Sequence, residues 1–184
     1  MRYPKEIVLK DGGEAVIRPL EKSDEPALKR FFEEIPGADR WYMRYDLLNP
    51  AVIRKWIDGI DTATVFSIIA LSEDRIVAHA SLHMRGFGST CHVGRLRIMV
   101  LPEFRHKRLG TWMLLDLIQL AMDKGLSDLR SDFVDGIEDT AVDAAQKLDF
   151  FEKARLKDYI KDPQGNRHDM IIMMKRLHKE WGDF

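Results

Sequence analysis

The sequence lacks the features that mark several common classes of protein. It contains one cysteine, Cys91, which excludes a disulfide within the chain and gives no sign of an oxidising compartment. No apolar run approaches the roughly 18 residues of a membrane-spanning helix, and residues 1–10 lack the apolar core of a signal peptide. We therefore expect a cytoplasmic protein with no membrane partner. Cys91 lies in an alternating apolar stretch, which favours a buried, inert thiol over a nucleophile.

Excess charge and metal-binding patterns are absent as well. The formal net charge is −1, whereas a general nucleic-acid-binding domain is usually strongly basic, so no nucleic-acid partner is expected. The histidines are scattered, and His79 and His83 lie in a predicted strand rather than on one face of a zinc-binding helix. We predict no metal site.

The chain does contain enough apolar sequence for one core. Its 184 residues are 45% hydrophobic, which suits a single domain over residues 1–184. Periodicity and turn residues predict strands and helices in alternation. The predicted strands are 6–9, 14–20, 66–71, 76–84, 90–100, 128–134, 150–161 and 167–177, and the predicted helices are 24–34, 50–59, 112–124 and 137–148. The apolar alternation changes phase at Gly94, which predicts a β-bulge there.

The stretch 100–124 dominates the sequence. A strand at 96–100 leads into a basic loop at 105–108, and a helix that is apolar on most of its surface follows. The first N–H groups of a helix have no partner within the helix, and the helix dipole leaves partial positive charge there, so this junction suits a pyrophosphate. A basic loop on a solvated surface is an equally weighted alternative. Neither G-x-x-x-x-G-K-[ST] nor G-x-G-x-x-G occurs, which excludes a P-loop and a dinucleotide fingerprint.

The spacing Arg105-x-x-Arg108-x-Gly110 resembles the acyl-CoA loop of the GNAT superfamily of N-acetyltransferases, [Q/R]-x-x-G-x-[G/A]. Arg108 stands in place of the middle glycine, and it can supply the same backbone N–H if the loop needs no positive φ there. The segment 147–150, Lys-Leu-Asp-Phe, is similar to the K-L-G-F of the family. The segment 17–20, Ile-Arg-Pro-Leu, is common in the family, including its bacterial protein-lysine acetyltransferase branch.

The resemblance implies an α/β (α+β) fold, with a mixed, mostly antiparallel, twisted sheet of six to seven strands flanked by about four helices. It also implies an acetyl-CoA-dependent N-acetyltransferase acting on a primary amine of a small molecule, a peptide or a protein lysine. The strand end would contact the pantetheine arm and the loop would hold the pyrophosphate. The residues implied in binding acetyl-CoA are Ile98, Met99, Val100, Arg105, His106, Lys107, Arg108, Leu109, Gly110 and Thr111.

The usual acid–base positions of the family are vacant in this chain. The segment 94–97 has no carboxylate where many relatives have a glutamate, and Ala145 stands where many have a tyrosine. The candidate catalytic residues are instead His92, Asp132, Glu138 and Tyr159, with His83 near the same expected cleft. Each also has a structural interpretation, such as a helix cap for Glu138 or a sheet-surface residue for Tyr159. A non-catalytic acyl-CoA-binding sensor with the same fold is therefore the alternative.

The acceptor and the oligomeric state stay open in the sequence. Arg95 and Arg97 could contact an acidic acceptor or the phosphates of CoA, or could be charges on the surface of the sheet. The aromatic residues of the segment 38–49 could line the acceptor site or cover the core. The apolar run 170–174 could meet the core or a second copy in a homodimer.

Overall fold

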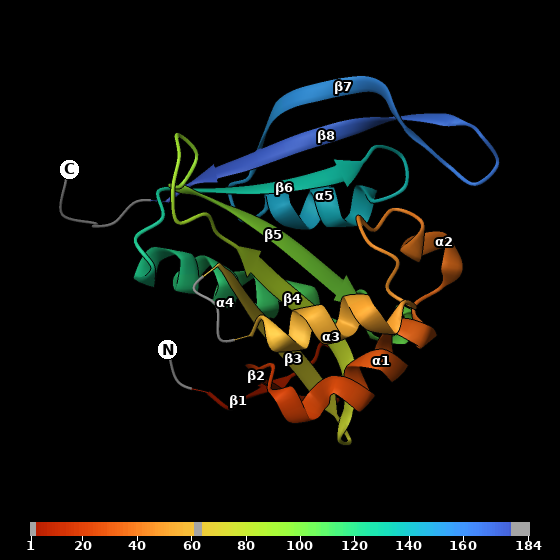
Figure 1. Cartoon of the computed structure of the whole chain (residues 1–184), viewed down its shortest axis with the longest axis vertical. Helices are drawn as coiled ribbons and strands as arrows, with labels where there is room; N and C mark the ends of the chain where they lie inside the picture. Colours follow the sequence, from red (N-terminus) through yellow and green to blue (C-terminus); the bar gives the residue numbers. More distant parts are fainter. Residues whose placement is uncertain (1–2, 61–63, 178–184) are drawn as a thin grey trace.

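The computed structural model describes residues 3–60 and 64–177, and Figure 1 shows their arrangement. The strands are β1 (Lys5–Val8), β2 (Glu14–Pro19), β3 (Val65–Ser72), β4 (Arg75–His83), β5 (Val93–Val100), β6 (Asp128–Val134), β7 (Phe151–Lys161) and β8 (Arg167–Arg176). The helices are α1 (Glu25–Glu34), α2 (Gly37–Arg40), α3 (Pro50–Asp58), α4 (Leu109–Asp123) and α5 (Asp139–Gln146), with short 3-10 turns at Lys22–Asp24 and Pro102–Phe104. None of the described helices combines the length and apolar character that crossing a membrane requires.

The strands form one sheet in the order β1-β2-β3-β4-β5-β6-β8-β7. Every neighbouring pair is antiparallel except β5 and β6, which are parallel. The expected fold class, a mixed and mostly antiparallel sheet with flanking helices, is confirmed. The described sheet has eight strands rather than six to seven, because the first hairpin contributes β1 and β2 as two separate strands at one end of the sheet. Five α-helices are present rather than about four, because residues 37–40 form a short helix.

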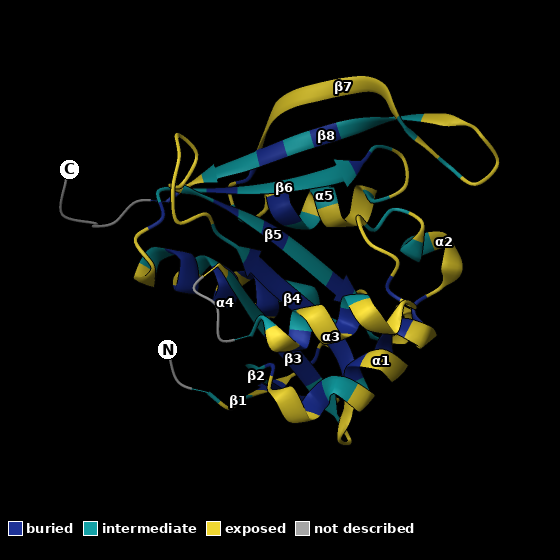
Figure 2. Ribbon diagram, in the orientation of Figure 1, coloured by how far each residue is buried: buried dark blue, intermediate teal, exposed yellow. Residues whose placement is uncertain are grey.

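The helices cover the two faces of the sheet. On one face, Trp56 of α3 stacks on His79 of β4 with ring centroids 5.9 Å apart, and Phe32 of α1 meets the same ring edge-on. On the other face, helix α4 packs against β5, where Gly110 lies beside the side chain of Val100. Strand β4 is buried along Ile76–Leu82, and Figure 2 shows this dark core between the two helical layers.

The sheet splits between β5 and β6. These strands pair only where Val93–Arg95 faces Asp128–Arg130. Beyond that point β5 continues along β4 as far as Val100, while β6 continues along β8 as far as Val134, so the two strands separate in Figure 1. The N–H of Leu101 donates to Val77 of β4. By alternation, the backbone groups of Ile98 and Val100 point into the split.

The β-bulge predicted at Gly94 is wrong. The register between β5 and β6 runs through Gly94 without a shift, from Val93 to Arg95, and the register between β4 and β5 continues without a shift from Arg95 to Val100. A Cβ at Gly94 would lie 2.6 Å from Leu82 Cδ1 and 2.8 Å from Leu126 Cδ1. The glycine is therefore required by close packing against the face of the sheet that α4 covers.

The burial predicted for Cys91 is also wrong, since its thiol is exposed. Strand β5 begins at Val93 rather than at Thr90, and residues 89–92 form a turn in front of it. Cys91 continues the apolar alternation of the strand in the sequence, but alternation indicates the buried face only within a strand, and Cys91 lies in the turn.

Candidate functional site

The N-terminus of α4 is open to an anion. Its N-cap residue, Arg108, makes no side-chain capping hydrogen bond, and the first turn contains no acidic residue. Helix α3 differs, because Asn49 caps it by accepting from the N–H of Ala51 at 2.9 Å. The first N–H groups of α4 therefore combine with the helix dipole to favour a negatively charged ligand.

The backbone at Arg108 is left-handed, with φ of 68°. The condition stated for Arg108, that the loop needs no positive φ there, is therefore not met. A left-handed conformation costs a residue with a Cβ about 1–2 kcal/mol. Arg108 thus adopts the backbone that a glycine takes freely, and the loop turns as it would with a glycine there.

Two basic side chains of the loop are tied to carboxylates. Arg105 donates through Nη2 to Asp39 Oδ2 at 2.6 Å and through Nε to the carbonyl of Val100 at 3.0 Å. Lys107 Nζ lies 2.7 Å from Asp11 Oδ2. These contacts hold the loop against the end of β5 and the first hairpin.

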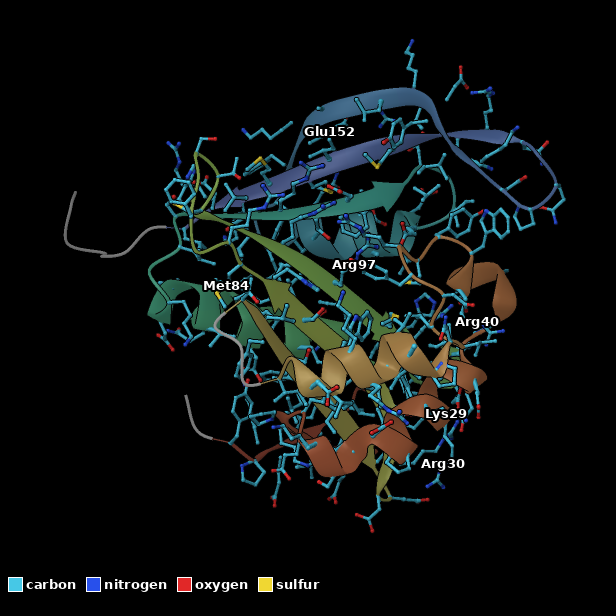
Figure 3. The ribbon with its side chains drawn as sticks, in the orientation of Figure 1. Lys29, Arg30, Arg40, Met84, Arg97 and Glu152 are labelled. Atoms are coloured by element: carbon cyan, nitrogen blue, oxygen red, sulfur yellow. The ribbon has the colours of Figure 1, made fainter. Side chains whose placement is uncertain are left out.

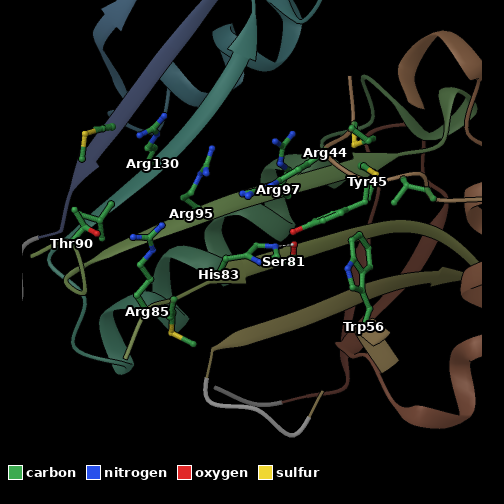
Figure 4. Close-up of a pocket in the computed structure, with 16 residues that line it drawn as sticks. Arg44, Tyr45, Trp56, Ser81, His83, Arg85, Thr90, Arg95, Arg97 and Arg130 are labelled. Carbon is green, nitrogen blue, oxygen red and sulfur yellow. Dashed lines mark hydrogen bonds between the residues drawn. The ribbon is translucent and has the colours of Figure 1, made fainter. Parts of the chain in front are cut away.

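A pocket of about 590 Å³ lies on the opposite face of the sheet from α4 (Figure 4). Strand β5 contributes Val93, Arg95, Arg97 and Met99, which share one face by alternation. The remaining lining residues are Met43, Arg44, Tyr45, Leu47, Trp56, Ser81, His83, Met84, Arg85, Thr90, Arg130 and Met174. The pocket therefore adjoins the split in the sheet from the side that α3 and the segment 43–47 cover.

Asp132 is held in an ionic network beside the pocket. Its carboxylate accepts hydrogen bonds from Arg95 and, at 2.7 Å, from Arg130. Burial alone would raise the pKa of Asp132, but the two guanidinium groups outweigh it and the pKa lies below its usual value. The structure thus places Asp132 as an anion that orients Arg95 and Arg130, and a carboxylate with a lowered pKa is a weaker proton acceptor.

His83 faces the pocket from the end of β4. Its Nε2 lies 3.0 Å from the hydroxyl of Ser81, and in Figure 4 Tyr45 points its ring towards this pair. Burial lowers the pKa of His83, and the positive charges of Arg97, Arg95 and Arg44 lower it further. The imidazole is therefore neutral near pH 7, and the same shift makes it a weaker proton acceptor than an exposed histidine.

Glu138 lies between the end of β6 and the start of α5. Its Oε2 accepts the N–H of Val134 at 2.7 Å. Burial raises the pKa of Glu138 although that hydrogen bond and Arg97 oppose the shift. The carboxyl group of Glu138 therefore lies at the end of β6, where the split between β5 and β6 is open. Glu138 does not line the pocket.

His92 and Tyr159 do not line the pocket. His92 is exposed in the turn before β5, where its carbonyl accepts from the N–H groups of Ser127 and Asp128. Tyr159 is 64% exposed on β7, at the far edge of the sheet. Their catalytic roles stay predictions.

The arginines of the pocket were only partly foreseen. Arg95 and Arg97 stood out in the sequence, but Arg44, Arg85 and Arg130 did not, because they come from different elements. The register that places Arg130 opposite Arg95 carries no local signal. Within residues 3–60 and 64–177, no group of three or more His, Cys, Asp or Glu side chains is arranged to hold a metal ion.

Comparison with known proteins decides the family. Residues 27–150 match the model of the acetyltransferase (GNAT) family. The chain belongs to the GNAT acetyltransferase family. The resemblance noted in the sequence is thereby confirmed, and this GNAT acetyltransferase uses acetyl-CoA. A comparison with curated proteins gives no match.

Solved structures show the same fold at low identity. A ribosomal-protein-alanine N-acetyltransferase from Brucella melitensis is 22% identical over 88% of this chain and 99% of its own, with a TM-score of 0.74. An N-acetyltransferase from Staphylococcus aureus Mu50 is 17% identical over 89% and 99% of the two chains, with a TM-score of 0.77. The Salmonella typhimurium protein yncA, solved with its cofactor acetyl-CoA, is 15% identical over 92% and 98%, with a TM-score of 0.76.

The residues of this GNAT acetyltransferase fit its cofactor. Along the split, the edge of β5 beyond Arg95 has no strand partner among the described residues and can pair with an amide-bearing chain such as pantetheine. The uncapped N-terminus of α4 lies where the chain leaves β5, and Gly110 leaves room above its first turn. Both features match the two ends of the cofactor, its amide arm and its pyrophosphate.

Proposed function

We propose that this GNAT acetyltransferase transfers an acetyl group to a primary amine bound in the pocket between β4, β5 and α3. The split between β5 and β6 carries this proposal, because it joins the open helix N-terminus on one face to the pocket on the other. When bound, acetyl-CoA supplies a thioester whose acetyl group is open to attack by an amine. The residues 98–100 and 105–111 are assigned to its binding.

The pocket must hold the acceptor amine in its neutral form, because a protonated amine has no free electron pair. We assign His83 as the proton acceptor because it lines the pocket and is neutral near pH 7, although its lowered pKa makes it a weaker base than an exposed imidazole. The nearby arginines assist, because positive charges lower the pKa of an amine placed beside them. Glu138 is the second candidate, because its raised pKa makes it a better base than an exposed carboxylate.

A charge reversal at the helix N-terminus tests the cofactor site. Gly110→Glu places a carboxylate at the first turn of α4, where the proposal places the pyrophosphate. A Cβ at this position meets only Val100 Cγ2, at 3.7 Å, so the fold should tolerate the change. We expect CoA binding by calorimetry to weaken at least about tenfold, as for loss of one charged contact.

Gln119→Glu is the matched control, since it adds the same charge on the exposed surface of α4, about 13 Å further along the helix. It should bind CoA as the wild type does. If the Gly110→Glu variant binds CoA as tightly as the wild type does, the pyrophosphate does not bind at the N-terminus of α4.

A non-catalytic acyl-CoA sensor remains the second candidate. It is favoured by Ala145, a buried methyl group where many relatives have a tyrosine. The two candidates differ in one measurement, because a sensor binds CoA yet releases no thiol from acetyl-CoA with any amine. Amine-dependent thiol release by the wild type, reduced in His83→Asn with a changed pH profile, would exclude the sensor.

A further inference from the structure

The pocket is strongly basic although the whole chain is not. Five arginines line it, and no aspartate or glutamate is among the lining residues, whereas the formal net charge of the chain is −1. Figure 4 shows Arg44, Arg85, Arg95, Arg97 and Arg130 around one space. A concentration of one charge in a concave site attracts ligands of the opposite charge.

Most of this positive charge has no internal partner. Asp132 pairs with Arg95 and Arg130 together. Arg44, Arg85 and Arg97 form no ion pair with any residue that the structure describes. Burial lowers the pKa of Arg97, against the field of Glu138, and Arg95 adds to the lowering. A guanidinium group withdrawn from water without an anion is unfavourable, so a bound anion would stabilise this arrangement.

Arg97 lies on the other face of the sheet from the helix N-terminus assigned to the pyrophosphate. Arg97 and Met99 face the pocket, whereas the neighbouring Val100 faces α4. The helix N-terminus assigned to the pyrophosphate therefore lies across the sheet from these arginines. Tyr45 and Trp56 complete the pocket with aromatic surface, and Arg44 lies 5.7 Å from the centre of the Tyr45 ring. The arginines are therefore placed away from the pyrophosphate site.

We infer that the acceptor of this enzyme is an amine that also carries a carboxylate or phosphate group, bound by Arg97 with Arg44 and Arg85. The inference rests on the proposed transfer to a primary amine and adds its substrate class. A guanidinium group binds either oxyanion through two parallel hydrogen bonds. The anionic group would fix the acceptor in the pocket, while the remaining positive charge would keep its amine neutral for attack.

Matched acceptor pairs that differ in charge provide the test. The pairs are glutamate and glutamine, phosphoserine and serine, and an acidic tripeptide and its amide analogue. Together they show whether the enzyme prefers a carboxylate or a phosphate, and whether it prefers a small molecule or a peptide. Thiol release from acetyl-CoA gives kcat/KM for each. Direct titration with N-acetylglutamate and N-acetylglutamine measures anion binding without turnover. We expect the anionic member of at least one pair to be favoured by about 10- to 100-fold, as for one charged hydrogen-bonded contact.

Arg97→Gln should abolish this preference and leave CoA affinity unchanged. Arg30→Gln is the control, because Arg30 lies on the outer side of α1 in Figure 3, away from Arg97. Turnover of the neutral member as fast as the anionic one in every pair would overturn the inference while the transferase function stands. Loss of CoA affinity in Arg97→Gln would overturn it too, because Arg97 would then belong to the cofactor site. If no amine is acetylated, equal or absent binding of N-acetylglutamate and N-acetylglutamine overturns it as well.

Discussion

His79 should make the stability of the protein depend on pH. Its ring is 1% exposed on β4, and neither ring nitrogen has a hydrogen-bond partner in the described structure. Trp56 stacks on one side of it and Phe32 meets its edge. Burial, with a smaller effect of His83, lowers the pKa of His79 from 6.5 to about 3.

The direction follows from proton binding. In the unfolded chain His79 takes up a proton below about pH 6.5, whereas in the folded chain it stays neutral until about pH 3. Acid therefore favours the unfolded state, and stability falls as the pH drops through this window. The loss from this group alone is about 1.4 kcal/mol at pH 5.5 and about 2.7 kcal/mol at pH 4.5, relative to pH 7.5.

The perturbation is His79→Leu, which removes the titrating group and two unsatisfied nitrogens. Urea unfolding followed by tryptophan fluorescence at pH 7.5, 5.5 and 4.5 gives the free energy of unfolding of both proteins. The stability of the variant relative to the wild type should rise by about 2.7 kcal/mol from pH 7.5 to pH 4.5. His92→Leu replaces an exposed histidine and should follow the wild-type profile. A stability difference between His79→Leu and the wild type that stays constant over these pH values would show that folding does not lower the pKa of His79.

Two further predictions concern the backbone. Arg108→Gly should be more stable than Arg108→Ala by about 1 kcal/mol in thermal unfolding, because only glycine adopts the φ of 68° without strain; equal stability would contradict the left-handed turn. Gly94→Ala should lower the free energy of unfolding by about 1–3 kcal/mol, because its Cβ meets Leu82 and Leu126. Gly86→Ala, with no atom within 4 Å of its Cβ, should be nearly neutral, and a similar effect at both glycines would refute the close packing.

The elements that local patterns define were predictable from the sequence. The hairpins around Gly12 and Gly165 and the long helix α4 carry their own turn residues and periodicity, and the structure has them. The loop before α4 was also recognisable, because its chemistry depends on consecutive residues. The phase change at Gly94 was misread, because Cys91 lies in the turn before β5 and Val93 faces the pocket, whereas Val100 faces α4.

The pocket was not predictable, because it depends on contacts between distant segments. Ser81 lies opposite Arg97, and Arg130 lies opposite Arg95. The sequence pattern of a single strand does not indicate which residues of another strand lie opposite it. The role of Asp132 changed for the same reason. In the sequence it is a carboxylate on a strand, whereas in the fold two arginines hold it as an anion.

The most direct test of the central claim is thiol release from acetyl-CoA by the wild-type protein, with and without the amine pairs described above. We predict thiol release that requires an amine, is fastest with an anionic one, and falls when His83 or Arg97 is replaced. Binding of CoA without amine-dependent thiol release, over the whole set of acceptors, would contradict transfer to an amine held in the arginine-lined pocket.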